Sequence, residues 1–273
     1  MRYLLRHFDA VLLIALLASC SKETDTEFSA IEDTAEFSIS AVEDGSVRTY
    51  LDSDGRTLLW GCGEYLQLYY NDGSAKFAKS LGSSADKYNG SASAVFDFSV
   101  SAAAAAQYAI GGVYPASSVI NVGGINNDDP AAYKVNLKSA QTSSGGKYDS
   151  EAFIMVMRPE TVSALSGEVN GYFRRAVALN HFVLKGAKEA VSAVEIIIEG
   201  FALAGKREIN LTNGQSGNIY EPSESVTVQF DASQTSQSID LWFTSRNVFL
   251  PAGGKMKVRV IGENNSYTKT IQA

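Results

Sequence analysis

The residue in this sequence with the most defined chemistry is Cys20, which closes the run Leu17-Ala18-Ser19-Cys20. A cysteine thiolate is the nucleophilic form of the side chain, and it can take a diacylglycerol group. The small side chains of Ala18 and Ser19 let a signal peptidase reach the bond between Ser19 and Cys20. Each buried methylene of an attached acyl chain adds about 0.8 kcal/mol to membrane binding. The spacing therefore predicts cleavage at this bond and a lipidated N-terminus at Cys20.

The residues before Cys20 have the three parts of a secretory signal. A short basic start, MRYLLRH, precedes the apolar residues 11–18 (VLLIALLA). This stretch is too short to span a bilayer, which takes roughly 20 apolar residues. We therefore predict a signal peptide over residues 1–19. Residues 17–20 resemble the lipobox of bacterial lipoproteins, in which a branched residue and two small residues precede a cysteine. The alternative is a plain secretory signal with an incidental cysteine.

A polar, acidic stretch follows the predicted lipid site. Residues 20–34 begin CSKETDTE, a composition typical of a flexible tether. Carboxylates directly after a lipidated cysteine also resemble the surface-export signal of lipoproteins in certain gut and oral anaerobes. We therefore expect a membrane partner through the N-terminal lipid, and a surface-exposed location on the cell outer membrane. The alternative for this stretch is an ordinary solvated linker.

The rest of the chain offers little that could perform catalysis. Beyond the signal there is one histidine, His181, and no Gly-x-Ser-x-Gly turn frames a nucleophile for it. Cys62 stands between two glycines and is best interpreted as a small buried side chain. Asp52-Ser53-Asp54-Gly55 copies the start of a calcium loop, but residue 63 is glycine where the closing glutamate would stand. The sequence thus predicts no enzyme, no cofactor and no metal site.

Charge excludes one further class of partner. The net charge is −7 and the sequence pI is about 5.0, and loss of the signal peptide makes the charge one unit more negative. Binding to nucleic acid requires clustered lysine and arginine that neutralise phosphates. This chain has no such cluster, so we expect no nucleic-acid partner.

Almost every segment after residue 35 alternates apolar and polar residues with the period of a β-strand. Residues 35–42 (AEFSISAV) place Phe37, Ile39 and Ala41 on one face, and residues 94–100 (AVFDFSV) do the same with Phe96 and Phe98. Such half-buried alternation is typical of antiparallel sheets packed face to face. We predict an all-β fold of two antiparallel sandwich domains, residues 35–165 and 166–273, with the boundary in a polar, glycine-containing stretch.

Several motifs in this order resemble the fimbrillin-like lipoproteins, the type V pilus subunits and their relatives. An Arg-Thr pair at residues 48–49 and an acidic turn precede the Trp60-centred strand LLWGCGEYLQLY. The strand end YAIGGVYP at residues 108–115 resembles the family's Y-x-x-x-Y-P pattern, and residues 248–261 resemble its closing hairpin. The motifs cover most of the chain after the signal.

The resemblance implies two tandem transthyretin-like β-sandwich domains and a role in fimbriae or cell adhesion. In pilus-forming members an Arg-specific protease removes the first strand, and a strand of the next subunit fills the groove that is left. Carried over to this chain, residues 35–42 are the removable strand and Arg48 is the candidate cleavage site, with Arg56 second. The chain stops at residues 267–273, where one or two more strands are expected, so either the ending is short or this member is an anchor, tip or stand-alone protein. Other fimbrial subunits are thus expected partners.

Two other functions stay open. A surface lipoprotein of a nutrient-uptake system would also be all-β and tethered, and would bind glycans. The aromatic residues that could stack on sugars are Tyr65, Tyr69, Tyr70, Tyr88 and Trp242. A glycoside hydrolase would need two carboxylates about 5–10 Å apart in a cleft, for which small strand-rich modules leave little room.

Overall fold

The fold is all-β, as the alternation predicts. The computed structural model describes residues 33–43, 50–51, 58–60, 65–82, 91, 93–122, 132–144, 147–211, 216–235 and 237–272. Within these ranges the only helical elements are two 3-10 turns, η1 (Ala116–Ser118) and η2 (Ser150–Ala152). No helix in the same ranges is long and apolar enough to cross a membrane. Residues 33–273 form one compact unit, which is the part described below.

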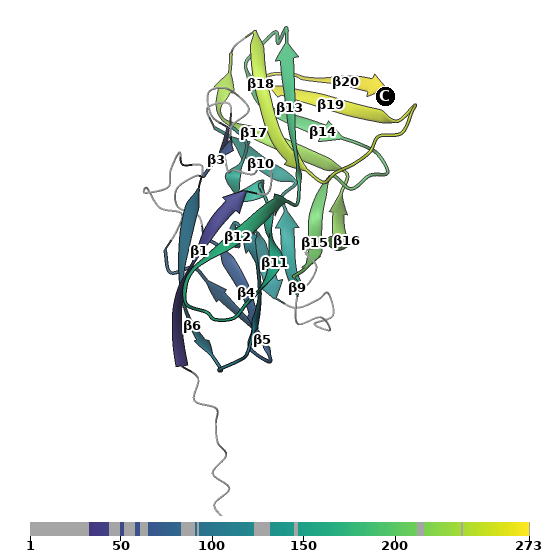
Figure 1. Cartoon of the computed structure of the whole chain (residues 1–273). Coiled ribbons are helices and arrows are strands. Elements are labelled where there is room, and N and C mark those ends of the chain that lie inside the picture. Colours follow the sequence, from purple (N-terminus) through teal and green to yellow (C-terminus); the bar gives the residue numbers. More distant parts are fainter. Residues whose placement is uncertain are drawn as a thin grey trace, which may run out of the picture. The chain divides into compact units, whose positions relative to one another are not determined.

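The largest sheet has seven strands in the order β5-β4-β7-β11-β12-β1-β6. Their bounds, in that order, are Ala75–Lys79, Gln67–Asn71, Tyr108–Tyr114, Met155–Val162, Gly167–Arg175, Asp33–Glu43 and Ala94–Ala102. Neighbouring strands are antiparallel except β1 and β12, which run parallel. Figure 1 shows β1 lying between β6 and β12.

A four-stranded antiparallel sheet packs against the seven-stranded one. Its order is β16-β15-β9-β8, with bounds Ser216–Ser223, Ala204–Asn210, Ala132–Leu137 and Val119–Val122. Tyr133 of β9 joins the two sheets, because its hydroxyl donates to the carbonyl of Leu68 at 2.5 Å and its ring lies 5.2 Å from that of Phe77. A small pair, β2 (Tyr50–Leu51) and β3 (Leu58–Leu59), precedes β4 in the chain.

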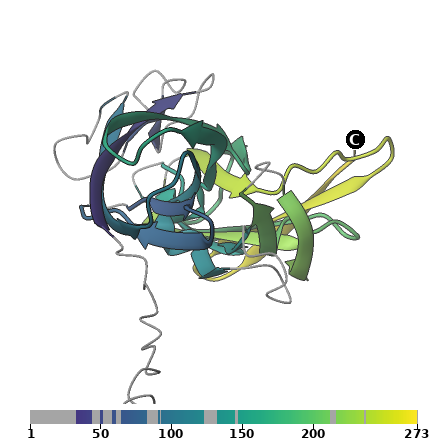
Figure 2. The same cartoon turned by 60° about the horizontal axis from the view of Figure 1, so that its bottom comes forward.

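The C-terminal strands form two further sheets. The larger has the order β10-β17-β14-β19-β20, with bounds Ala140–Ser143, Ser225–Gln234, Val191–Ile197, Lys255–Gly262 and Ser266–Gln272. The smaller pairs β13 (Ala178–Lys185) with β18 (Ser238–Ser245). β10 and β17 are parallel, so the described strands include this parallel pair besides β1 and β12, where the sequence predicted antiparallel sheets only. In Figure 2 the yellow C-terminal hairpin of β19 and β20 extends outward from the other strands.

The buried faces are those that the alternation predicts. Phe96 and Phe98 of β6 are buried, as are Ile239, Leu241 and Phe243 of β18. An aromatic cluster anchors the core of the seven-stranded sheet: the Trp60 ring lies 4.8, 5.7 and 6.2 Å from the rings of Tyr114, Phe96 and Phe173. Edge-on aromatic pairs at such distances add about 0.5–1.5 kcal/mol each beyond the area that they bury.

Strand pairing crosses the boundary predicted at residue 165. β12 starts at Gly167 yet belongs to the seven-stranded sheet, while β9 pairs with β15 and β10 pairs with β17. Turn residues mark where a strand ends, but they do not specify which strand it pairs with. Arg175 is the last residue of the seven-stranded sheet, but β10 belongs to the C-terminal five-stranded sheet and precedes it, so no single residue divides the sheets.

Asp72 ties the β4–β5 turn to the end of β6. Its carboxylate accepts from the amide of Ala103 at 2.7 Å and lies 2.9 Å from Nζ of Lys76. Burial raises the pKa of this carboxyl, but the hydrogen bonds from Lys76, Ala103 and Ser74 outweigh burial and lower the pKa to about 2. The ionised form is thus the one that the fold favours.

Because the pKa of Asp72 is lower in the folded than in the unfolded chain, its contribution to stability is present above about pH 4. It is lost as the pH falls from about 4 to 2. Asp72→Asn should cost about 1 kcal/mol in the free energy of unfolding at pH 7 and almost nothing at pH 2. Urea unfolding of both proteins at the two pH values measures this, and an equal difference at both would contradict the assignment.

Candidate functional site

The residues with predicted covalent chemistry lie outside the described residues. These are Cys20 with its lipobox, and the two candidate cleavage residues Arg48 and Arg56. In the sequence Arg48 falls between β1, which ends at Glu43, and β2, which begins at Tyr50. What the structure describes is the strand that cleavage at Arg48 would set free.

That strand, β1, is an interior strand of the seven-stranded sheet. Its residues 37–43 pair in parallel with residues 167–173 of β12. On its other edge residues 33–41 pair antiparallel with residues 102–94 of β6. Both edges of β1 therefore use their backbone groups, and the strand fills a slot between two others. We define this slot, between β12 and β6, as the β1 slot.

Side chains fix the register of β1 in its slot. Phe37, Ile39 and Ala41 are buried, as predicted, and the Phe37 ring stacks on that of Phe98 at 5.5 Å between centroids. On the opposite face the Ser38 hydroxyl donates to a carboxylate oxygen of Asp97 at 2.6 Å. A shift by one residue would turn Phe37 and Ile39 outward and the serines inward. The register is thus strongly specified.

Gly171 of β12 is a part of the slot that the sequence reasoning missed. A Cβ atom built at this position would lie 2.5 Å from Cγ2 of Ile39 and 3.1 Å from Cε2 of Phe173. The absence of a side chain on β12 therefore makes the space that Ile39 occupies. A glycine within a strand is a known sequence signal for close approach of a neighbouring group, and this signal was available at Gly171.

His181 lies on the outer face of the β13–β18 pair. Its ring stacks on Trp242 with 4.0 Å between centroids and 5° between planes, and Nε2 is 2.8 Å from a carboxylate oxygen of Asp240. Pairing explains the arrangement, because His181 stands directly opposite Trp242 in the register. The sequence predicted a sandwich or interface residue here, and the structure places His181 on an exposed sheet surface.

The other aromatic candidates for sugar stacking are mostly unavailable. Tyr69 and Tyr70 are both buried in β4. Tyr65 has Nζ of Lys79 3.8 Å from its ring centroid. Tyr88 lies outside the described residues. Trp242 is the remaining candidate among the described residues; it is half-buried, and one face of its ring lies against the His181 ring. No group of three or more metal-ligating side chains occurs in the described ranges either.

Comparison with known proteins finds two similar solved structures from Bacteroides ovatus. No protein-family model matches the chain, and neither does any curated protein. One of the two structures is described as a "putative cell adhesion protein"; its identity is 13% and its TM-score 0.47, over 87% of this chain and 86% of that chain. The other, a "putative adhesin", is 9% identical with a TM-score of 0.40, over 88% and 76% of the two chains.

Gly171→Ala should loosen β1, because the added methyl would overlap Ile39. We expect a loss of about 1–3 kcal/mol in the free energy of unfolding, the usual cost of overpacking. Hydrogen exchange of the β1 amides should also become faster in the variant, and this acceleration should be larger than that of the β4 amides. Gly82→Ala is the matched control, since no atom lies within 4 Å of a Cβ at that position. Equal stability of Gly171→Ala and the unchanged protein would show that the slot is not tightly fitted.

Proposed function

We propose that the chain is a lipoprotein anchored in the outer membrane through Cys20, and that it acts as a fimbrial subunit, an anchor or an adhesin-like structural protein. The observation that supports this most directly is the position of β1. It is an interior strand by pairing, yet every other described strand follows Arg48 in the sequence. One cut at Arg48 would therefore separate a central strand from the rest of the fold.

The same cut would also remove the predicted lipid anchor, because Cys20 lies on the same side of Arg48 as β1. The intact chain would stay on the membrane with its slot filled. After the cut, only noncovalent contacts would hold β1 in its slot, and the rest of the chain would leave the membrane when β1 leaves the slot. Anchoring and strand exchange are thus alternatives controlled by one peptide bond.

Exchange requires a competing strand, because β1 does not leave its slot at no cost. Burial of a phenylalanine or isoleucine side chain contributes roughly 1.5–3 kcal/mol each. A donor strand would have to restore the backbone pairing with β12 and β6 and fill the positions of Phe37 and Ile39. In strand addition of this kind, backbone hydrogen bonds supply affinity and the side-chain pockets supply specificity. The two halves of the fold would be the tandem transthyretin-like sandwiches that the resemblance implies.

A glycan-binding role is the alternative, and the stacked pair of Trp242 and His181 beside Asp240 is the observation in its favour. Flat aromatic surfaces next to a carboxylate suit sugar rings, which present both C–H faces and hydroxyls. Selective retention of the uncleaved protein on a polysaccharide array would favour this alternative. The proposal above assigns no catalytic step to the chain.

The lipid anchor is tested by Cys20→Ala. In a native-type host the unchanged protein should partition with the outer membrane and carry the mass of its acyl chains. The variant should be found in the soluble fraction, because no further anchor is proposed. Mass spectrometry of the N-terminal peptide decides the point. An unacylated N-terminus in the unchanged protein would contradict it.

Strand exchange is tested by cleavage with an Arg-specific protease. If another copy supplies a strand to the β1 slot, the cleaved protein should form ladders on denaturing gels, since exchanged strands are held by a full set of backbone hydrogen bonds. Arg48→Lys combined with Arg56→Lys keeps both charges, and this variant should remain a monomer after the same treatment. A cleaved product that stays at unit length at high concentration would exclude self-polymerisation through the β1 slot.

A further inference from the structure

The second feature of the molecule that suggests binding lies at the edge of strand β13. β13 pairs with β18 along its whole length, and no other strand in the described part of the chain pairs with it. The pair faces a sheet of five strands, since Phe182 and Phe243 of the pair line one hollow together with Ile196 of β14 and Met256 of β19. The larger sheet therefore has more strands than the smaller one can cover.

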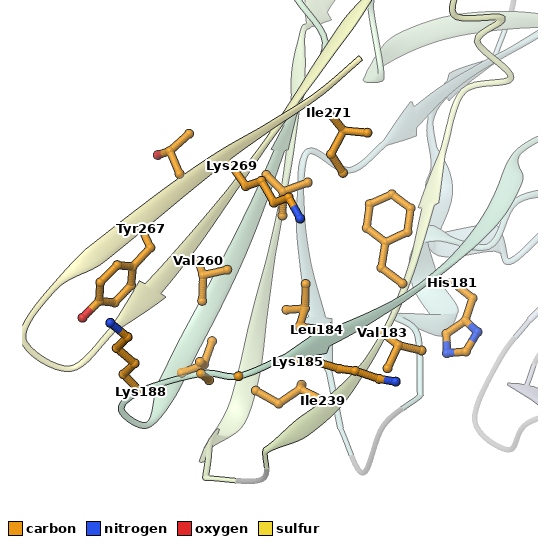
Figure 3. Close-up of a pocket in the computed structure, with 16 residues that line it drawn as sticks. His181, Val183, Leu184, Lys185, Lys188, Ile239, Val260, Tyr267, Lys269 and Ile271 are labelled. Atoms are coloured by element: carbon orange, nitrogen blue, oxygen red, sulfur yellow. The ribbon is translucent and has the colours of Figure 1, made fainter. Parts of the chain in front are cut away.

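A groove follows the open side of β13. One hollow of about 600 Å³ lies at its C-terminal end and one of about 390 Å³ at its N-terminal end, and Phe182 lines both. Five strands contribute apolar side chains to the larger hollow, namely β13, β14, β18, β19 and β20. Figure 3 labels four of these side chains, Leu184, Ile239, Val260 and Ile271, around a common space. We call the two hollows together the β13 groove.

Strand β20 borders the same groove and is covered by nothing in the described structure. All of its residues are exposed, among them Tyr267 at 45% and Ile271 at 41%. Both line the larger hollow, as does Val183 of β13, which is 46% exposed. Three large apolar side chains are thus accessible beside a strand with a free backbone edge. An uncapped edge of this kind is a template for pairing with another chain.

Lysines give the larger hollow of the β13 groove a positive charge, while the Asp240 carboxylate lies 2.8 Å from Nε2 of His181 at its border. Lys185, Lys188 and Lys269 line this hollow together with His181, and that lining contains no carboxylate. In Figure 3 the side chains of these lysines lie at the border of the apolar space. The chain as a whole carries a net charge of −7, so this is a local reversal of sign. A ligand that places apolar groups in the groove therefore gains from carrying negative charge.

We propose that the β13 groove binds an extended, acidic polypeptide segment of a partner protein, which adds as a strand to the free edge of β13. Alternate side chains of the segment would enter the groove and face β19 and β20, and its carboxylates would lie near the three lysines. β13 has eight residues, so a partner strand of similar length would span about 26 Å at 3.3 Å per residue. The groove is already open, so this binding needs no cleavage at Arg48 and does not rest on the function proposed above.

The test uses the uncleaved mature protein in detergent and a fluorescent ten-residue peptide of alternating valine and glutamate. Two peptides serve as comparisons: one with the same composition but all valines consecutive, and one with lysine in place of glutamate. Fluorescence anisotropy should show saturable binding of the alternating acidic peptide only. Hydrogen exchange should slow in β13 on binding and stay unchanged in β1.

The variant Lys185→Glu with Lys269→Glu should weaken binding about tenfold, because it replaces two attractive charge contacts by repulsive ones. Lys255→Glu is the matched control, since Lys255 is an exposed lysine of β19 outside the groove lining, and it should change affinity less than about twofold. Ile271→Asp, at an exposed position, tests the apolar contact without endangering the fold and should also weaken binding.

Three results would overturn the proposal. They are no saturable binding of the alternating acidic peptide, equal binding of the peptide with consecutive valines, and equal loss of affinity in Lys255→Glu and the double variant. Arg48 is intact in all of these experiments. A negative result for the β13 groove therefore does not bear on strand exchange in the β1 slot, and a negative result for strand exchange does not bear on the β13 groove.

Discussion

The interaction on which the structure depends most is the two-sided backbone pairing of β1. β6 lies at the edge of the seven-stranded sheet, and β1 is its one partner there among the described strands. β6 in turn supplies Phe96 and Phe98, and Phe96 contacts the Trp60 ring at the centre of the aromatic cluster. Loss of β1 would therefore expose a slot and also detach a strand that carries core side chains. This is why a vacated slot has a strong physical tendency to be filled again.

The direction of any replacement strand is restricted by the neighbours of β1. One neighbour is parallel and the other antiparallel, so reversal of the incoming strand would change both hydrogen-bond patterns at once. The side-chain positions add a second restriction, since only alternate residues face the core and the space at Ile39 depends on the missing side chain of Gly171. Polarity and register together make the slot selective for a strand much like β1.

The sequence predicted the parts of this fold that depend on local pattern. Alternation correctly identified the buried faces of β1, β6 and β18, because a strand with one buried face must repeat with period two. Local pattern could not predict which strands pair, since pairing is set by contacts between residues far apart in the chain. For that reason the boundary at residue 165 did not anticipate that β12 would join β1 and β11.

Local pattern also failed to predict that β4 is buried on both faces. Tyr69 and Tyr70 point to opposite faces of β4, and both are buried because the strand is covered on each side. Arg207 of β15 is a further case, since a charged residue is seldom expected in a core. Its guanidinium donates to the carbonyl of Ala176, and burial followed by the nearby charge of Arg246 lowers its pKa to about 10. Cys20, Arg48 and Arg56 lie outside the described residues, so their roles stay predictions.

The β1 slot and the β13 groove are both positions at which a strand can pair with a sheet, but the first is filled and the second is open. In the first, the chain fills a strand position with its own residues; in the second, the larger sheet extends past the smaller and leaves a position open. An open apolar edge would normally invite association between identical copies. Strand β13 itself carries no carboxylate, so a second copy of this edge would bring no charge that the groove lysines attract. An acidic strand would bring such charges, so the same lysines favour this partner over a second copy.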